Sequence, residues 1–95
     1  MPPQVHDWTL RAVNVDWGEG VARVVFDSPT GRNHLRAHGL RNLHIPRAES
    51  WGPSGSVNEA QGPLEFEGGL VRFLIEMQSG DLIEIVARSF DLSAS

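Results

Sequence analysis

The chain of 95 residues contains no cysteine and no lysine, and no long apolar run. Without cysteine it forms no disulfide, and any metal site would have to use His, Asp and Glu. Small secreted domains usually depend on disulfides, so we expect a cytoplasmic location. No apolar run approaches the roughly 18 residues that span a bilayer. The N-terminal MPPQVHDWTL also lacks the basic and apolar regions of a signal peptide. We therefore expect no membrane association.

The same absences narrow the chemistry. Thiol nucleophiles and lysine Schiff bases are excluded. Neither a phosphate-binding GxxxxGK[ST] nor a GxGxxG occurs, and GPSGS at residues 52–56 does not match the Gly-x-Ser-x-Gly of a nucleophile elbow. Ser, His and Asp are all present, so composition alone leaves a hydrolytic triad open. We expect a protein that is not an enzyme and needs no cofactor, with a metal-dependent enzyme as the weaker alternative.

The charge is acidic overall, with 8 basic and 12 acidic residues and a net charge of −4. This balance argues against a nucleic-acid partner, which favours a basic face. Arginine and histidine are nevertheless concentrated between residues 32 and 47, and we interpret this segment as a solvated strand face. His34 and His38 would lie roughly 13 Å apart on a strand, too far for one ion. Only a helix would leave a zinc site open, and the glutamate of the usual motif is absent, so we predict no metal site.

Alternating apolar residues indicate strands through most of the chain. Residues 8–27 predict a β-hairpin with its turn at residues 18–20, where two glycines allow a tight reversal. One apolar row contains Val13, Val15 and Trp17, and the returning row contains Ala22, Val24 and Phe26. Residues 34–45 are ambiguous between a helix and two strands separated by a bulge at Gly39. Flanking β signals favour the two strands.

The last third predicts the clearest hairpin. Pairing Gln78 with Leu82 across a three-residue loop puts both apolar rows on one face, with Gly80 or Asp81 at positive φ. In that register Glu76 lies directly opposite Glu84. Such a carboxylate pair is a candidate site, since it can share a proton or bind a cation. The alternative interpretation is two solvated acids that contact nearby arginines.

Residues 46–63 form the longest segment without a sustained period, and such segments are often functional or locally structured. Trp51 is either an anchor that closes one end of the fold or an exposed platform for a sugar or a partner side chain. Polar residues near it would complete a binding patch. The candidate binding residues are Trp51, Ser54, Ser56, Asn58 and Glu59.

Frequent turns and no convincing long amphipathic helix predict an all-β fold. We expect a single domain over residues 1–95, an antiparallel β-sandwich or small open barrel of about six strands. One long structured loop interrupts it, and residues 1–6 and 91–95 are expected to be flexible tails.

Five short stretches together resemble a group of small, largely uncharacterised bacterial proteins, some of which look like immunity proteins of toxin systems. These stretches are DWTL at 7–10, IPR at 45–47 leading to WGPS at 51–54, SVN at 56–58 and EMQSGD at 76–81. The resemblance implies a cytoplasmic bacterial β domain that binds another protein. We therefore predict protein–protein binding, with a homodimer through an exposed strand edge as one form of it. The alternative is a small-ligand or carbohydrate-binding module built on Trp51.

Overall fold

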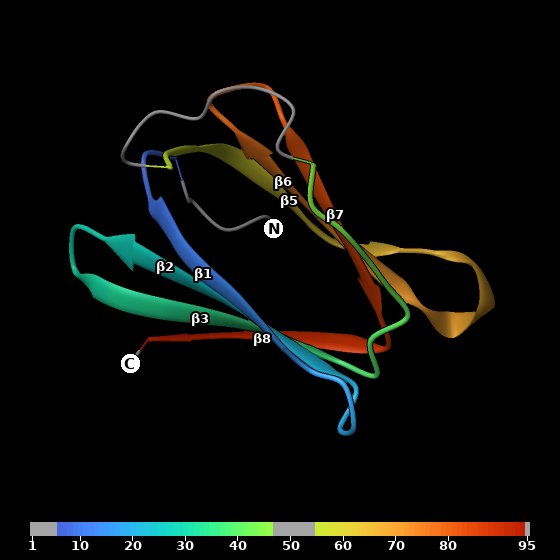
Figure 1. Cartoon of the computed structure of the whole chain (residues 1–95). Helices are drawn as coiled ribbons and strands as arrows, with labels where there is room; N and C mark the ends of the chain where they lie inside the picture. Colours follow the sequence, from blue (N-terminus) through green and yellow to red (C-terminus); the bar gives the residue numbers. More distant parts are fainter. Residues whose placement is uncertain (1–5, 47–54, 95) are drawn as a thin grey trace.

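The computed structural model describes residues 6–46 and 55–94, which form two antiparallel sheets of four strands each (Figure 1). In the first sheet the strand order is β1-β2-β3-β8, and in the second it is β4-β7-β6-β5. The strands are β1 (Thr9–Asp16), β2 (Val21–Ser28), β3 (Gly31–His38), β4 (Asn42–His44), β5 (Val57–Glu65), β6 (Val71–Met77), β7 (Leu82–Ala87) and β8 (Ser89–Ala94). A 3₁₀ turn, η1 (Glu67–Gly69), joins β5 to β6.

The prediction of an all-β, antiparallel single domain is confirmed, and the two sheets do not close into a barrel. The number of strands was too low, because two segments were misassigned. Residues 57–63 of the expected loop region form most of β5 (Val57–Glu65), which pairs with β6. Residues 91–94 of the expected tail belong to β8, which pairs with β3 along its length. The remainder of the expected loop, residues 47–54, lies outside the described residues.

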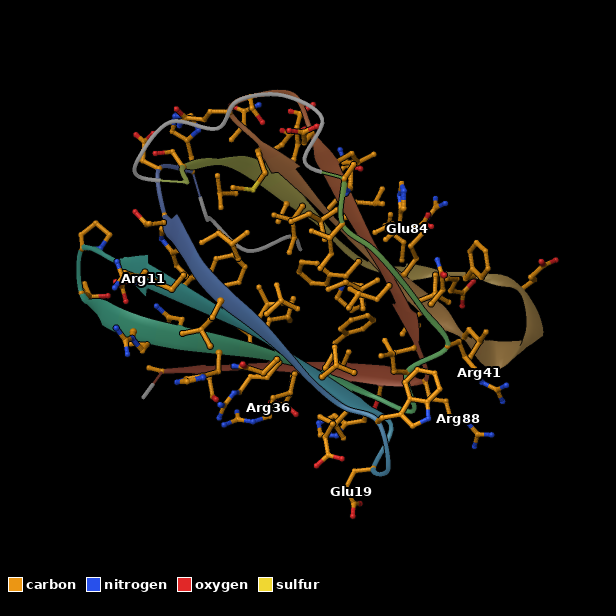
Figure 2. All side chains as sticks on the ribbon, viewed as in Figure 1. Arg11, Glu19, Arg36, Arg41, Glu84 and Arg88 are labelled. Atoms are coloured by element: carbon orange, nitrogen blue, oxygen red, sulfur yellow. The ribbon has the colours of Figure 1, made fainter. Side chains whose placement is uncertain are left out.

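The core lies between the two sheets and takes apolar side chains from both (Figure 2). Side chains along a strand alternate between its two faces, so every second side chain points into the core. Two aromatic contacts add to this packing. Trp8 meets Phe26 edge to face with ring centroids 5.8 Å apart, and Phe73 meets Phe90 at 5.4 Å. The fully buried side chains of largest volume are Leu35, Ile75, Met77, Ile83, Ile85, Val24 and Val57.

The segment 34–45 crosses from one sheet to the other at Gly39. The two strands favoured for this segment are confirmed, but the bulge between them is wrong, since β3 belongs to the first sheet and β4 to the second. Gly39 has a φ of 66°, and a Cβ at this position would lie 2.8 Å from the Cγ of Arg88. Arg88 stands between β7 and β8, where the chain makes its second crossing. Glycine is therefore needed at a corner where two crossings pass closely.

The hairpin of β6 and β7 has the predicted loop length but a different register. The loop is Gln78–Gly80, because the Met77 N–H donates to the Asp81 carbonyl at 2.9 Å. Gly80 has a φ of 98°, as predicted. The apolar rows still share the inner face, because the register is shifted by two residues and side chains alternate between the faces with a period of two. Glu84 consequently lies opposite Leu74, so the expected direct pairing of Glu76 with Glu84 is wrong.

The first hairpin also ends earlier than expected. β1 stops at Asp16, which leaves Trp17 in the turn and outside the apolar row. Within β1 the pairing shifts between Leu10 and Ala12, so Arg11 is an extra residue on this strand. Such a bulge reverses the direction of the side chains that follow it.

Candidate functional site

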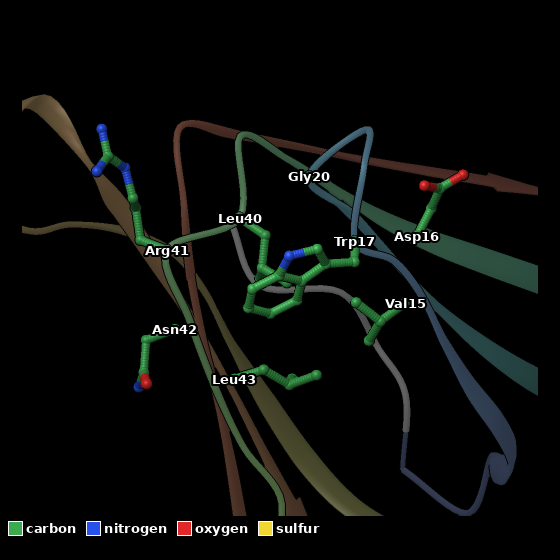
Figure 3. Close-up of a pocket in the computed structure, with 8 residues that line it drawn as sticks. All are labelled: Val15, Asp16, Trp17, Gly20, Leu40, Arg41, Asn42 and Leu43. Carbon is green, nitrogen blue, oxygen red and sulfur yellow. The ribbon is translucent and has the colours of Figure 1, made fainter.

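The main candidate site is a cleft between the β1–β2 turn and the connection from β3 to β4 (Figure 3). Its volume is about 470 Å³. We call it the Trp17 cleft, and its lining residues are Val15, Asp16, Trp17, Gly20, Leu40, Arg41, Asn42 and Leu43. β1 and β4 are both edge strands of their sheets. The cleft therefore lies where neither sheet continues into a further described strand.

Local hydrogen bonds fix the backbone of the turn that carries Trp17. The Gly20 N–H donates to the Asp16 carbonyl at 2.9 Å, and the Glu19 N–H donates to Asp16 Oδ1 at 3.0 Å. Gly20 has a φ of 66°, which a side chain would disfavour. The Leu40 N–H donates to the Gly20 carbonyl at 2.8 Å, which ties the turn to the opposite wall. The backbone around Trp17 is thus fixed before any partner binds.

The cleft combines an apolar floor with a polar rim. In Figure 3 the side chains of Trp17, Val15, Leu40 and Leu43 border the cleft, whereas Asp16, Arg41 and Asn42 point away from it. Trp17 is 91% exposed and Val15 is 45% exposed, although Leu40 and Leu43 also pack against the core. Keeping a tryptophan in water forgoes the burial that normally stabilises such a large ring.

Arg41 adds an available positive charge to this rim. Within residues 6–46 and 55–94, its guanidinium makes no ion pair. Its backbone N–H donates to the Val86 carbonyl at 2.8 Å, which anchors the residue beside β7. The cleft can therefore accept an apolar group together with a neighbouring carboxylate.

Of the binding residues predicted around Trp51, the three that the structure describes, Ser56, Asn58 and Glu59, do not line this cleft. Trp51 and Ser54 lie outside the described residues. Ser56 bridges to Thr9 next to the start of β5, and its carbonyl accepts from the Gln78 N–H at 2.9 Å. Asn58 donates through Nδ2 to Glu76 Oε1 at 2.6 Å. These contacts connect β5 to its neighbours, and Glu59 beside them is exposed.

The two carboxylates of the predicted pair, Glu76 and Glu84, have different neighbours. Glu84 meets Arg72 with Oε2 to Nη1 at 3.5 Å, in line with the alternative of acids beside arginines. The carboxylate directly opposite Glu76 belongs to Glu59 on β5. In the part of the chain that the structure describes, no three metal-ligating side chains come together. His34 and His38 both lie on the extended strand β3.

A basic cluster covers the outer face of the first sheet. Arg23 lies directly opposite Arg36, and His34 is on the same face as both. His34 Nδ1 is shielded from water and has no hydrogen-bond partner among the described residues. Shielding, followed by the positive charges of Arg23, Arg36 and Arg32, lowers the pKa of His34 from its usual 6.5.

The lowered pKa of His34 predicts how the free energy of unfolding depends on pH. The unfolded chain takes up a proton on His34 as the pH falls below 6.5, before the folded chain does. The free energy of unfolding should therefore fall with decreasing pH until the pH passes the folded pKa. Urea unfolding at about pH 7.5 and about pH 5.5 measures this loss, which should be smaller in His34→Gln than in wild type. His44→Gln, at an exposed position on β4, is the control and should behave as wild type. An equal loss in all three proteins would contradict the assignment.

Comparisons with known proteins bear on the fold alone. No protein-family model matches the chain, and no curated protein matches it in sequence, so the resemblance to small bacterial proteins stays a prediction. The chain is similar in structure to an uncharacterized protein from Neisseria gonorrhoeae, with a TM-score of 0.70. Sequence identity is 12%, and the match covers 95% of this chain and 93% of the other. Among the described residues, no helix is long and apolar enough to cross a membrane.

The sequence contained a signal for the Trp17 turn that the alternation obscured. Asp16 has a side chain that readily accepts from a backbone N–H shortly after it, and aspartate commonly begins turns for this reason. With Asp16 as the first turn residue, Trp17 belongs to the turn and not to the apolar row. Nothing in the local sequence, however, indicated that Leu40 and Leu43 would form the opposite wall.

Proposed function

We propose that this is a non-enzymatic bacterial protein that binds another protein, and that the Trp17 cleft receives an apolar side chain of that partner. The exposure of Trp17 on a hydrogen-bonded turn, at 91%, is the observation that carries the proposal. Tryptophan is enriched among the residues that dominate protein interfaces, because its large ring gains most when a partner excludes water from it. A fixed backbone lowers the entropy lost on binding.

The rim of the cleft specifies the chemistry of the partner segment. The floor of Val15, Leu40 and Leu43 suits one large apolar side chain. Arg41 suits an Asp or Glu next to that side chain, since a charge-assisted hydrogen bond to arginine is stronger than a neutral one. We therefore propose a partner segment in which an apolar residue and a carboxylate are neighbours. The lack of cysteine supports a cytoplasmic site of action.

The test compares three forms of the tagged chain in a bacterial lysate: wild type, Trp17→Ala and Leu82→Ala. Leu82 is 45% exposed on the second sheet and controls for the loss of any exposed apolar side chain. A protein retained by wild type and by Leu82→Ala, but lost from Trp17→Ala, is the expected result. Titration of that purified protein should then show an affinity for Trp17→Ala at least about 30-fold weaker, as for a dominant interface residue. Arg41→Glu should weaken the same complex. Equal retention by Trp17→Ala would contradict the proposal.

A carbohydrate-binding function is the second candidate, and the polar rim is what favours it. An exposed indole face can stack on a sugar ring, and polar residues lie beside it at the rim of the cleft. Titration with soluble oligosaccharides, followed by tryptophan fluorescence, distinguishes the two functions. A saturable change that disappears in Trp17→Ala would support sugar binding over protein binding.

A further inference from the structure

The four edge strands differ in how open they are to pairing with another strand. In the first sheet, β1 is interrupted at Arg11, and its start already bonds to the segment before β5, with the Leu10 N–H donating to the Gly55 carbonyl at 3.0 Å. In the second sheet, β4 has only 3 residues. The pairing of β5 is broken between Gln61 and Leu64, where Pro63 has no N–H to donate. Bulges, short strands and proline are devices that prevent edge pairing.

β8 has none of these devices. It pairs with β3 from Ser89 to Ala94 without a register shift, and no described strand lies on its other side. Its single charge, Asp91, is already paired within the sheet, with Oδ2 2.6 Å from His38 Nε2. Leu92 lies opposite Leu35 in the inner row and is 42% exposed. This edge therefore carries unpaired backbone groups and an apolar side chain without a protecting charge.

We propose that β8 pairs antiparallel with β8 of a second copy of this chain, about a two-fold axis at Leu92. This self-association is independent of the Trp17 cleft. A two-fold pairing places one residue opposite itself, and each neighbour then faces its symmetric counterpart. Leu92 meets Leu92 of the second copy, Asp91 meets Ser93, and Phe90 meets Ala94. The first sheet then continues across the axis as one sheet of eight strands.

Charge and length favour this axis over its neighbours. An axis at Asp91 would set two carboxylates directly opposite each other, which is destabilising. Axes at Phe90 or Ser93 would leave fewer residues of β8 in the pairing. With the axis at Leu92, each Asp91 lies opposite a serine hydroxyl. Ser93 Oγ accepts from Arg36 Nη1 at 2.8 Å, so its own hydrogen is available for Asp91 of the second copy.

Light scattering tests whether the dimer forms. We expect the mass to rise with concentration from 10.5 kDa toward twice that value. Leu92→Lys places two like charges opposite each other and should keep the chain monomeric. Leu82→Lys is the matched control, since Leu82 is 45% exposed on the other sheet, and it should dimerise as wild type does. Circular dichroism checks that both variants keep the β fold. A mass of 10.5 kDa for wild type at the highest concentration would overturn the proposal, as would dimerisation of folded Leu92→Lys.

Single cysteines test the register, because the natural chain has none. Directly opposite residues have Cα atoms about 4.5–5.5 Å apart, within the range that a disulfide bridges. Under oxidised glutathione, Leu92→Cys should form a covalent dimer at least about tenfold faster than Leu82→Cys, which reports random collision. Faster cross-linking by Asp91→Cys than by Leu92→Cys would reject the axis at Leu92. Equal rates for Leu92→Cys and Leu82→Cys would reject pairing through β8.

Discussion

Replacing Leu35 with alanine is expected to lower the free energy of unfolding by about 3–4 kcal/mol, the middle of the range for a buried leucine. Leu35 lies in the centre of the first sheet, with Val24 of β2 opposite it on one side and Leu92 of β8 on the other. Its side chain is 2% exposed and belongs to the core that both sheets share. Truncation removes apolar area from the core and leaves a cavity that rigid strands cannot fill.

The matched control for this experiment is Leu82→Ala. It makes the same chemical change on a strand of the other sheet, but Leu82 is 45% exposed. The free energy of unfolding of Leu82→Ala should fall by less than about 1 kcal/mol, since little apolar area leaves the core and no closed cavity forms. Urea unfolding followed by circular dichroism measures both variants, because a small single domain normally unfolds in one cooperative step. Equal losses in the two variants would contradict the packing of Leu35 in the core.

Gly62→Ala is expected to cost about 3 kcal/mol, because backbone strain and a steric clash add together. Gly62 has a φ of 144°, a conformation that residues with a side chain rarely adopt. A Cβ there would lie 2.8 Å from Cδ2 of Phe73 and 3.0 Å from the carbonyl oxygen of Arg72. Phe73 is 4% exposed, so its ring has little room to move away.

Gly31→Ala separates these two contributions. Gly31 has a similar φ of 131°, but no atom lies within 4 Å of the position a Cβ would occupy. It should therefore show the backbone cost alone, about 1–2 kcal/mol. The difference in unfolding free energy between the two variants measures the clash with Phe73. A loss in Gly62→Ala no greater than that in Gly31→Ala would show that β5 moves away from β6 without cost.

The sequence predicted the elements in which neighbouring residues determine the structure. Alternation with a period of two indicated the strands of both hairpins, and Gly80 was correctly expected at positive φ in the second. These features are local, since side-chain direction and turn geometry depend on adjacent residues. The short strand β8 was missed because a strand of 6 residues with two serines has a weak pattern by itself. It is stable because β3 supplies its hydrogen bonds.

The register of the β6–β7 hairpin was only partly determined by neighbouring residues. The alternation of side chains correctly put the rows of Phe73 and Ile85 on one face. A register shifted by two residues, however, is equally compatible with this alternation. The observed register is the one in which Asp81 is buried and accepts from the Ser79 hydroxyl at 3.0 Å. The partners of Glu76 and Glu84 depended on this choice, which is why the predicted carboxylate pair was wrong.

The sequence by itself determined that this protein is an all-β domain without thiol or lysine chemistry, since composition and alternation are properties of the chain alone. Only the tertiary structure decided where the candidate site lies. The Trp17 cleft joins a turn of the first hairpin to Leu40 and Leu43, and Gly39 directs the chain between sheets to bring them together. The distance between the turn and these two leucines is set by the packing of two sheets on one core, and no local pattern of residues encodes it.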